Sequence, residues 1–180
     1  RDTFYVNAKI DNIFGNDGND VFSFGSSSGV VNLISGGDGI NELSGRNQNS
    51  IWIMSGANAG SVSTSASPVD IYVQSFNGIT KLVGNAGSDQ LQTNVLGNTW
   101  SVEDVNSGKL YATATPTASI DFVGMENLLG NEEVDKFVFE LNGNVTGLID
   151  GGTTEFKDRN QDIVDLSLRT DGVTVQLGRY

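Results

Sequence analysis

Glycines recur along this chain at a nearly constant interval, and each stands between two short apolar stretches. Five segments align on such a glycine: "IFGNDGNDVF" at Gly15, "ISGGDGINEL" at Gly36, "LVGNAGSDQL" at Gly84, "LLGNEEVDKF" at Gly130 and "LIDGG" at Gly151. The separations are 21, 48, 46 and 21 residues. Gly60 and Gly108 fall near the midpoints of the two long gaps and are interpreted as two further corners. A repeat of about 20–25 residues is typical of chains in which similar units stack.

The residues around the aligned glycines support this alignment. A large aliphatic residue stands two positions before the glycine, and a large apolar residue stands seven positions after it in four of the five segments. The first set is Ile13, Ile34, Leu82, Leu128 and Ile149, and the second is Phe22, Leu43, Leu91 and Phe137. Trp52 and Trp100 are 48 residues apart, as are Pro68 and Pro116. Residues 50–94 and 98–140 are therefore predicted to be a duplicated double unit.

The apolar stretches have the pattern of strands. "VFSF", "IWIM", "KFVFEL" and "VTVQL" are rich in β-branched and aromatic residues that mostly alternate with polar ones, and no segment has a sustained helical stripe. The predicted fold is an all-β, right-handed parallel β-solenoid of seven or eight coils, each 21–24 residues long. Residues 1–180 are expected to form a single solenoid that is a fragment of a longer repeat array. Glycine at the corners is expected to supply positive φ angles in tight turns. The large apolar residues before and after each corner are expected to point inward and to stack in columns with their counterparts one coil away.

Composition excludes several functional classes. The formal net charge is −12, and such a surface repels the phosphate backbone of nucleic acid. The chain has no histidine and no cysteine, which excludes nucleophile–histidine catalysis and a disulfide scaffold. No apolar run approaches the roughly 20 residues of a membrane span. The sequence therefore predicts neither a nucleic-acid-binding protein nor a membrane-spanning one.

The first two corners contain a candidate calcium site. "GNDGNDVFS", starting at Gly15, is close to one unit of the calcium-binding nonapeptide G-G-x-G-x-D-x-U-x. Calcium takes six to eight oxygen ligands, so two stacked corners would have to share one ion. The candidate ligands are Asp17, Asp20, Asp38 and Asn41. The alternative interpretation is that these side chains only cap turns, a role also predicted for Asp89 and Asp135.

The second half of the chain carries an ordered series of motifs. These are "NTWSVEDVNSGKL", "IDFVGMENLLGNEEVDKFVFE", "GLIDGG" and "DIVDLSLRTDGVTVQLG". In this order they resemble the repeat regions of very large secreted bacterial proteins, the RTX-type exoproteins and haemagglutinin-like adhesins. The resemblance covers about residues 50–179, and it implies an extracellular or bacterial cell-surface location. It also implies a role as a spacer or adhesive stalk.

The preferred interpretation is a non-catalytic structural or adhesive repeat segment. Its expected partners are other repeats of the same longer chain, together with an extracellular glycan or surface protein. The alternative is a calcium-binding, RTX-like carrier module of an exported enzyme, with calcium as its cofactor. A third interpretation is a carbohydrate-active β-helix, in which Trp52 and Trp100 would stack on sugar rings. Equal spacing in a repeat favours instead a shared packing role for these two tryptophans.

Overall fold

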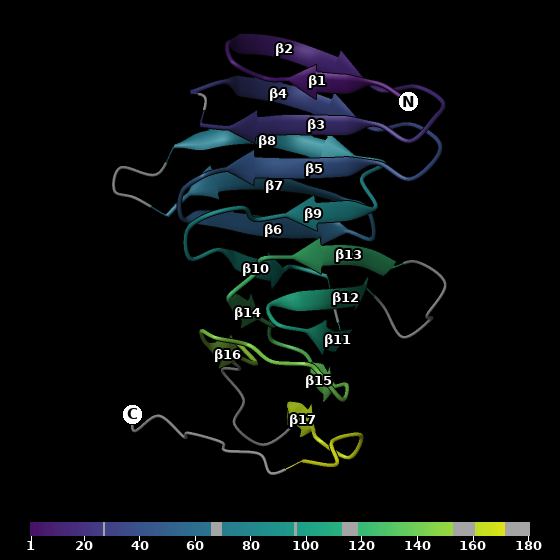
Figure 1. The fold of residues 1–180 in the computed structure, drawn as a ribbon, viewed down its shortest axis with the longest axis vertical. Helices are drawn as coiled ribbons and strands as arrows, with labels where there is room; N and C mark the ends of the chain where they lie inside the picture. The colour runs from purple at the N-terminus through teal and green to yellow at the C-terminus, as the bar shows by residue number, and fades with distance from the viewer. Residues whose placement is uncertain (27, 66–69, 96, 113–118, 153–160, 172–180) are drawn as a thin grey trace.

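The computed structural model describes residues 1–26, 28–65, 70–95, 97–112, 119–152 and 161–171. In these ranges the chain forms 17 strands and their turns, with no helix, which confirms the predicted all-β class. The strands form two sheets, which we call sheet A and sheet B. Figure 1 shows the strands stacked along the long axis, with β1 and β2 at one end and β17 near the other.

Sheet A has nine strands and sheet B has eight. The spatial order in sheet A is β1 (Thr3–Tyr5), β3 (Val21–Gly25), β5 (Glu42–Arg46), β9 (Lys81–Val83), β13 (Ser119–Val123), β12 (Ser107–Ala112), β11 (Asn98–Asp104), β15 (Lys136–Phe139) and β17 (Ile163–Asp165). The order in sheet B is β2 (Lys9–Phe14), β4 (Val30–Ser35), β8 (Ile71–Asn77), β7 (Ala59–Thr64), β6 (Ser50–Gly56), β10 (Gln90–Thr93), β14 (Asn127–Leu129) and β16 (Ile149–Asp150).

Both sheets are mixed, and this corrects the expectation of purely parallel pairing. Most neighbours are parallel, such as β2 with β4 and β3 with β5. Two antiparallel meanders interrupt this pattern, with β6, β7 and β8 in sheet B and β11, β12 and β13 in sheet A. Each meander fills three strand positions of one sheet before the chain crosses to the other sheet.

The meanders also correct the interpretation of Gly60 and Gly108 as corners. Both glycines lie inside strands, β7 and β12, in the middle of a meander. Each pairs across the ladder with an aromatic residue, Gly60 with Phe76 and Gly108 with Phe122. A Cβ atom on Gly60 would lie 2.8 Å from the Phe76 ring. These two glycines therefore make room for a ring and do not turn the chain.

The duplicated unit predicted at 50–94 and 98–140 corresponds to two five-strand units, β6–β10 and β11–β15. The third strand of a meander pairs with a strand that precedes its unit, β8 with β4 and β13 with β9. The fourth strand likewise pairs backwards, β9 with β5 and β14 with β10. The fifth strand pairs with the first of its own unit, β10 with β6 and β15 with β11. Because the chain crosses between the sheets three times from one meander to the next, the two units place their meanders in opposite sheets.

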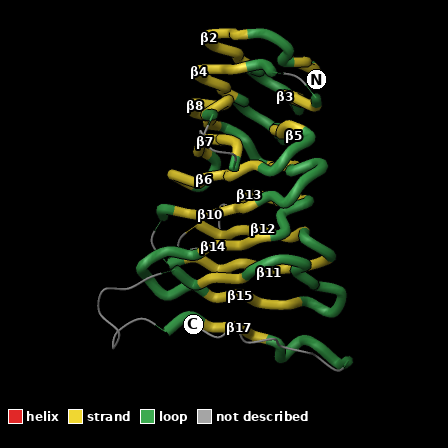
Figure 2. The backbone as a smooth tube through the Cα atoms, turned by 90° about the vertical axis from the view of Figure 1, so that its left-hand side faces the viewer, coloured by secondary structure: helices red, strands yellow, loops and turns green. Residues whose placement is uncertain are grey.

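The space between the sheets holds the core. Ile34, Leu82 and Leu128, which precede corner glycines, are at most 1% exposed, and Phe22 and Phe137, which follow them, are equally buried. Figure 2 shows the successive layers of strands that carry these residues along the long axis. The predicted inward columns are therefore confirmed. Pro68 and Pro116, the other part of the duplication pattern, lie outside the described residues.

Side chains from the two sheets meet in this core. Phe24 of β3 contacts Tyr72 of β8 edge to face, with ring centroids 5.2 Å apart. Trp52 and Trp100 are fully buried, and the Trp100 ring stacks on that of Phe137 at 5.5 Å. The packing role predicted for the two tryptophans is confirmed, because neither indole is available to a sugar.

Candidate functional site

The five aligned glycines lie at the corners that the sequence predicts. Gly15, Gly36, Gly84, Gly130 and Gly151 directly follow β2, β4, β9, β14 and β16. Their conformational role differs from the expected one, because positive φ occurs at the next residue, at Asn16 (64°), Gly37 (80°) and Asn85 (70°). The aligned glycine itself is needed for a close approach.

That close approach is made by the polar side chain that begins the next strand. A Cβ atom on Gly15 would lie 2.6 Å from Oδ2 of Asp20, and a Cβ on Gly84 would lie 2.6 Å from Oδ2 of Asp89. Any larger residue at the corner would therefore displace the carboxylate that packs on it. At the last corner Asp162 occupies the same place over Gly151.

The polar side chains at successive corners form three hydrogen-bonded ladders, which we call the corner ladders. In each ladder a side chain accepts the backbone N–H of the equivalent residue one strand earlier in the sheet. In the first, Asp2 N–H donates to Asp20 Oδ1 at 2.6 Å, Asp20 N–H to Asn41 Oδ1 at 2.9 Å, and Asn41 N–H to Thr80 Oγ1 at 3.0 Å. The ladders thus satisfy N–H groups at the point where each strand begins.

The other two ladders repeat this arrangement. In the second, Ser50 N–H donates to Asp89 Oδ1 at 2.8 Å, and Asp89 N–H donates to Glu126 Oε2 at 2.7 Å. In the third, Asn98 N–H donates to Asp135 Oδ1 at 3.2 Å, and Asp135 N–H donates to Asp162 Oδ1 at 3.0 Å. The turn-capping role predicted for Asp135 is confirmed by the Asn131 N–H, which donates to Asp135 Oδ2 at 2.8 Å. The Asp89 carboxylate instead accepts the N–H of Ser50 on a neighbouring strand.

The sequence analysis missed the remaining ladder members. Thr80, Glu126 and Asp162 directly precede a strand, whereas Ser50 and Asn98 are the first residues of theirs. The available signal was a polar residue at the start of each apolar stretch. The spacing from the corner glycine does not reveal these residues, because Asp20, Asn41, Asp89 and Asp135 are the polar residues at the fifth position after an aligned glycine.

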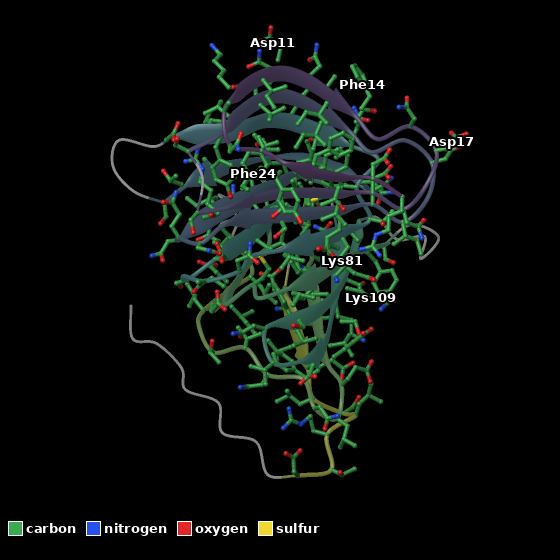
Figure 3. All side chains as sticks on the ribbon, turned by 45° about the horizontal axis from the view of Figure 1, so that its top comes forward. Asp11, Phe14, Asp17, Phe24, Lys81 and Lys109 are labelled. Atoms are coloured by element: carbon green, nitrogen blue, oxygen red, sulfur yellow. The ribbon has the colours of Figure 1, made fainter. Side chains whose placement is uncertain are left out.

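The structure brings together only part of the predicted calcium set. Asp20 and Asn41 are buried neighbours in the first ladder. Both polar atoms of the Asn41 amide are engaged, because Nδ2 also donates to the carbonyls of Gly37 and Gly78. Asp17 and Asp38 are exposed on the turns, and Figure 3 shows Asp17 at the outer edge of its corner. Among the described residues no group of three or more Asp, Glu, His or Cys side chains could hold a metal.

Burial makes one ladder carboxylate unusual in its titration. Burial raises the pKa of Asp89 to about 7, against the opposing effect of the Ser50 N–H, and the Glu126 carboxylate raises it further. Oδ2 of Asp89 is buried without a hydrogen-bond partner among the described residues. The Asp89 carboxyl is therefore close to half protonated at neutral pH.

The outer face of sheet A carries a row of alternating charge. Glu42, Lys81, Asp121 and Lys109 occupy aligned positions on four strands. Lys81 Nζ lies 2.9 Å from Glu42 Oε2, and Lys109 Nζ lies 3.5 Å from Asp121 Oδ1. Figure 3 shows both lysines on the same side of the molecule. A row of this kind is typical of a solvated sheet face, and each exposed pair contributes little stability.

One groove, of about 500 Å³, lies at the end formed by β1 and β2 and is lined by residues including Phe4, Tyr5 and Phe14. Another, of about 330 Å³, is lined by residues including Gln92, Asn131 and Asp150. Neither groove contains the buried ladder carboxylates Asp20 and Asp89. The carboxyl group of Asp89 is therefore positioned to hold the backbone N–H of Ser50.

Comparisons with family models, with curated proteins and with solved structures give no match for this chain. In the described ranges no helix has the length and apolarity to cross a bilayer.

Proposed function

We propose that this chain is a non-catalytic structural segment of a secreted or cell-surface bacterial protein, in which it acts as a spacer or adhesive stalk. In this proposal the two mixed sheets are the two faces of a right-handed β-solenoid of seven or eight coils, and the segment belongs to a longer repeat array. The observation that carries the proposal is the pairing rule of the five-strand units.

The way in which one five-strand unit pairs with the unit before it would allow further units to be added in the same way. The unit β11–β15 docks on β6–β10 through the same pairings by which β6–β10 docks on β4 and β5. The fourth and fifth strands of each unit thus offer the next unit two strand edges equivalent to those of β4 and β5, on which the first unit docks. A chain of such units grows along one axis, with contacts only between neighbours, which is the geometry of a spacer.

The distribution of chemically competent groups also supports a structural role. Glycoside cleavage requires two carboxyl groups on either side of a bond in an accessible cleft. Asp20, Asp89 and Asp135 are at most 1% exposed and bind backbone N–H groups. In the proposed role, partners are other repeats of the array, and an extracellular glycan or surface protein would contact the exposed strand faces.

The experiment is the insertion of one complete extra unit, a copy of residues 50–97 placed directly after Gly97. Four of the five strands enter one sheet and one enters the other, which is an average of 2.5 strand spacings, so the particle should lengthen along its central axis by about 12 Å. Small-angle X-ray scattering measures this length. The matched control inserts residues 50–80 alone, which lack β9 and β10. That variant should lose stability, because its meander takes the edge of β9 on which the following unit docks and supplies no fourth and fifth strands in its place.

A complete extra unit that leaves the length unchanged, or that aggregates as the partial unit does, would contradict the proposal. Turnover of acidic glycans that copurifies with the intact chain would contradict its non-catalytic part and favour the carbohydrate-active interpretation.

A further inference from the structure

The end of the molecule formed by β1 and β2 carries two strand edges and an apolar groove. β1 is the first strand of sheet A and β2 the last of sheet B, so each pairs on one side only within the described residues. The groove between them has a volume of about 500 Å³. Tyr5 is 76% exposed and Phe14 is 55% exposed, and Figure 3 shows Phe14 at this end. Open edges beside apolar side chains favour the addition of strands.

The first corner ladder fixes a register for such strands. Asp20 and Asn41 each accept the backbone N–H of the equivalent residue one strand earlier, at 2.6 and 2.9 Å. Asp2 occupies the next position of this ladder, and its own N–H is the donor to Asp20. The Asp2 side chain is exposed and accepts no hydrogen bond from any described residue. The ladder therefore has a carboxylate in place for a backbone N–H one strand beyond β1.

The aromatic residues of the core point to the same addition. The Phe4 ring stacks on the Phe22 ring, with centroids 5.0 Å apart and planes 5° from parallel. Phe4 is aligned with Phe22 in the β1–β3 ladder, and Phe22 is aligned with Leu43 in the next. The column of apolar side chains thus ends at Phe4, whose opposite side faces the groove. An added strand would continue the column with an apolar residue over Phe4.

We propose that the end formed by β1 and β2 is a docking surface for a further pair of strands that run parallel to them. The docked pair places a backbone N–H on the Asp2 carboxylate and an apolar side chain on Phe4, with the apolar pattern of β3 and β4. This proposal rests on the proposed function, and it names a neighbouring repeat of the array as the partner of the end formed by β1 and β2. The occupant is a neighbouring repeat of the array, because the ladder and the aromatic column both require a strand parallel to β1 in the register of β3.

The experiment fuses a copy of residues 20–39 directly before Arg1, so that the copied Asp20 falls one strand beyond Asp2. Hydrogen exchange of β1 and β2 should slow by about tenfold or more in the fused protein, because their open edges become paired. Tyr5 should also become protected from iodination. Asp2→Ala, made in both proteins, should reverse much of this protection in the fused protein. It should leave exchange in the unfused protein unchanged.

Three outcomes would overturn the proposal. The first is a fused protein in which Tyr5 and the β1 amides stay as accessible as before. The second is an equal effect of Asp2→Ala with and without the added strands. The third is concentration-dependent association of the unfused chain that protects Tyr5, which would assign this end to a second copy. The internal insertion of residues 50–97 does not involve this end, so these failures are distinct from a failure of the spacer proposal.

Discussion

At the scale of single residues, the structure depends on pairs of a corner glycine and a polar side chain. The glycine leaves space for the carboxylate or amide, and the carboxylate or amide accepts the N–H of the preceding strand. Asn41 and Asp89 occupy equivalent places, but only Asn41 can donate from its second atom, to the carbonyls of Gly37 and Gly78. Oδ2 of Asp89 has no partner among the described residues. Ionisation of the buried Asp89 carboxyl therefore destabilises the folded protein.

The first prediction concerns Asp89 and pH. The pKa of Asp89 is about 7 in the native protein, against 3.8 ordinarily, because the carboxyl is buried. Between these values the native state binds more protons than the unfolded state, so stability falls as pH rises from about 4 to about 7. The full shift corresponds to about 4 kcal/mol. Asp89→Asn should remove this dependence and stabilise the protein at pH 8 by roughly 1–3 kcal/mol, since the amide keeps the Ser50 bond.

Urea unfolding at pH 4.5 and pH 8, followed by the fluorescence of the two buried tryptophans, measures this effect. The matched reverse variant is Asn41→Asp, which places a carboxylate against the carbonyls of Gly37 and Gly78. It should destabilise the protein more at pH 8 than at pH 4.5. Parallel pH profiles for the wild type and Asp89→Asn would show that this carboxyl does not titrate between these values.

At the scale of elements, each corner joins a strand of one sheet to a strand of the other and positions a ladder residue. The corners at Gly15 and Gly36 are adjacent, as shown by the bond from Gly18 N–H to the Asp38 carbonyl at 2.9 Å. Their carboxylates nevertheless lie in different environments, because Asp20 is buried in the first ladder whereas Asp17 and Asp38 are exposed to solvent. One ion would have to gather ligands from both environments.

The second prediction concerns calcium at these two corners. We expect millimolar calcium to leave the melting temperature unchanged, because Oδ1 of Asp20 and both polar atoms of Asn41 already bind protein groups, and Asp17 and Asp38 are exposed on the turns. Among these side chains Oδ2 of Asp20 is the buried oxygen without a hydrogen-bond partner in the described residues. Asp20→Ala should cost about 1 kcal/mol with or without calcium, as the loss of a side-chain cap does. Thermal melts in calcium and in chelator measure both effects.

Asp89→Ala is the control variant for this experiment, since it removes a ladder carboxylate far from these corners. A site loaded to a hundredfold over its Kd would add about 2.7 kcal/mol. A rise of several degrees that a chelator reverses, and that is lost in Asp20→Ala but kept in Asp89→Ala, would establish the calcium site and favour the carrier-module interpretation.

At the scale of the whole molecule, each strand pairs only with its neighbours along one axis. Stability in such an arrangement is the sum of local terms and neighbour interfaces, so the ends open more easily than the middle. Leu82 of β9 is fully buried between β5 and β13, whereas Val164 of β17 is 52% exposed at one end. The position of a residue along the axis should therefore decide how much it contributes.

The third prediction compares these two positions. Leu82→Ala should cost on the order of 2–5 kcal/mol, because it leaves a cavity in the closed core. Val164→Ala should cost less than about 0.5 kcal/mol, as surface changes do. Urea unfolding measures both variants. In the wild type, hydrogen exchange in β9 and β13 should be at least about a hundredfold slower than in β1 and β17. Uniform protection along the axis, or equal costs for the two variants, would contradict this gradient.

The sequence by itself determined the local features of this protein. Alternating apolar residues identified the strands and the faces they bury, which is why Phe22, Leu82 and Phe137 lie in the core as predicted. Glycines at regular intervals identified the five corners, and the spacing of Trp52 and Trp100 identified the duplicated units. These signals are local, or are repeats of a local pattern, so they can be found without knowing which strands are neighbours.

Only the tertiary structure decided which strands pair and in which direction. Gly60 and Gly108 have the spacing of corners, yet antiparallel meanders place each of them opposite an aromatic ring. The Asp89 N–H donates to the Glu126 carboxylate, which is 37 residues away in the sequence, and no local sequence pattern predicts that bond. The two similar units lie with their meanders in opposite sheets because the chain crosses between the sheets three times per unit, and these crossings are known only from the structure. Pairing between strands so far apart in the sequence is fixed by the packing of the whole core. The backbone groups of one strand can be satisfied by a parallel or by an antiparallel neighbour, so they do not decide the direction.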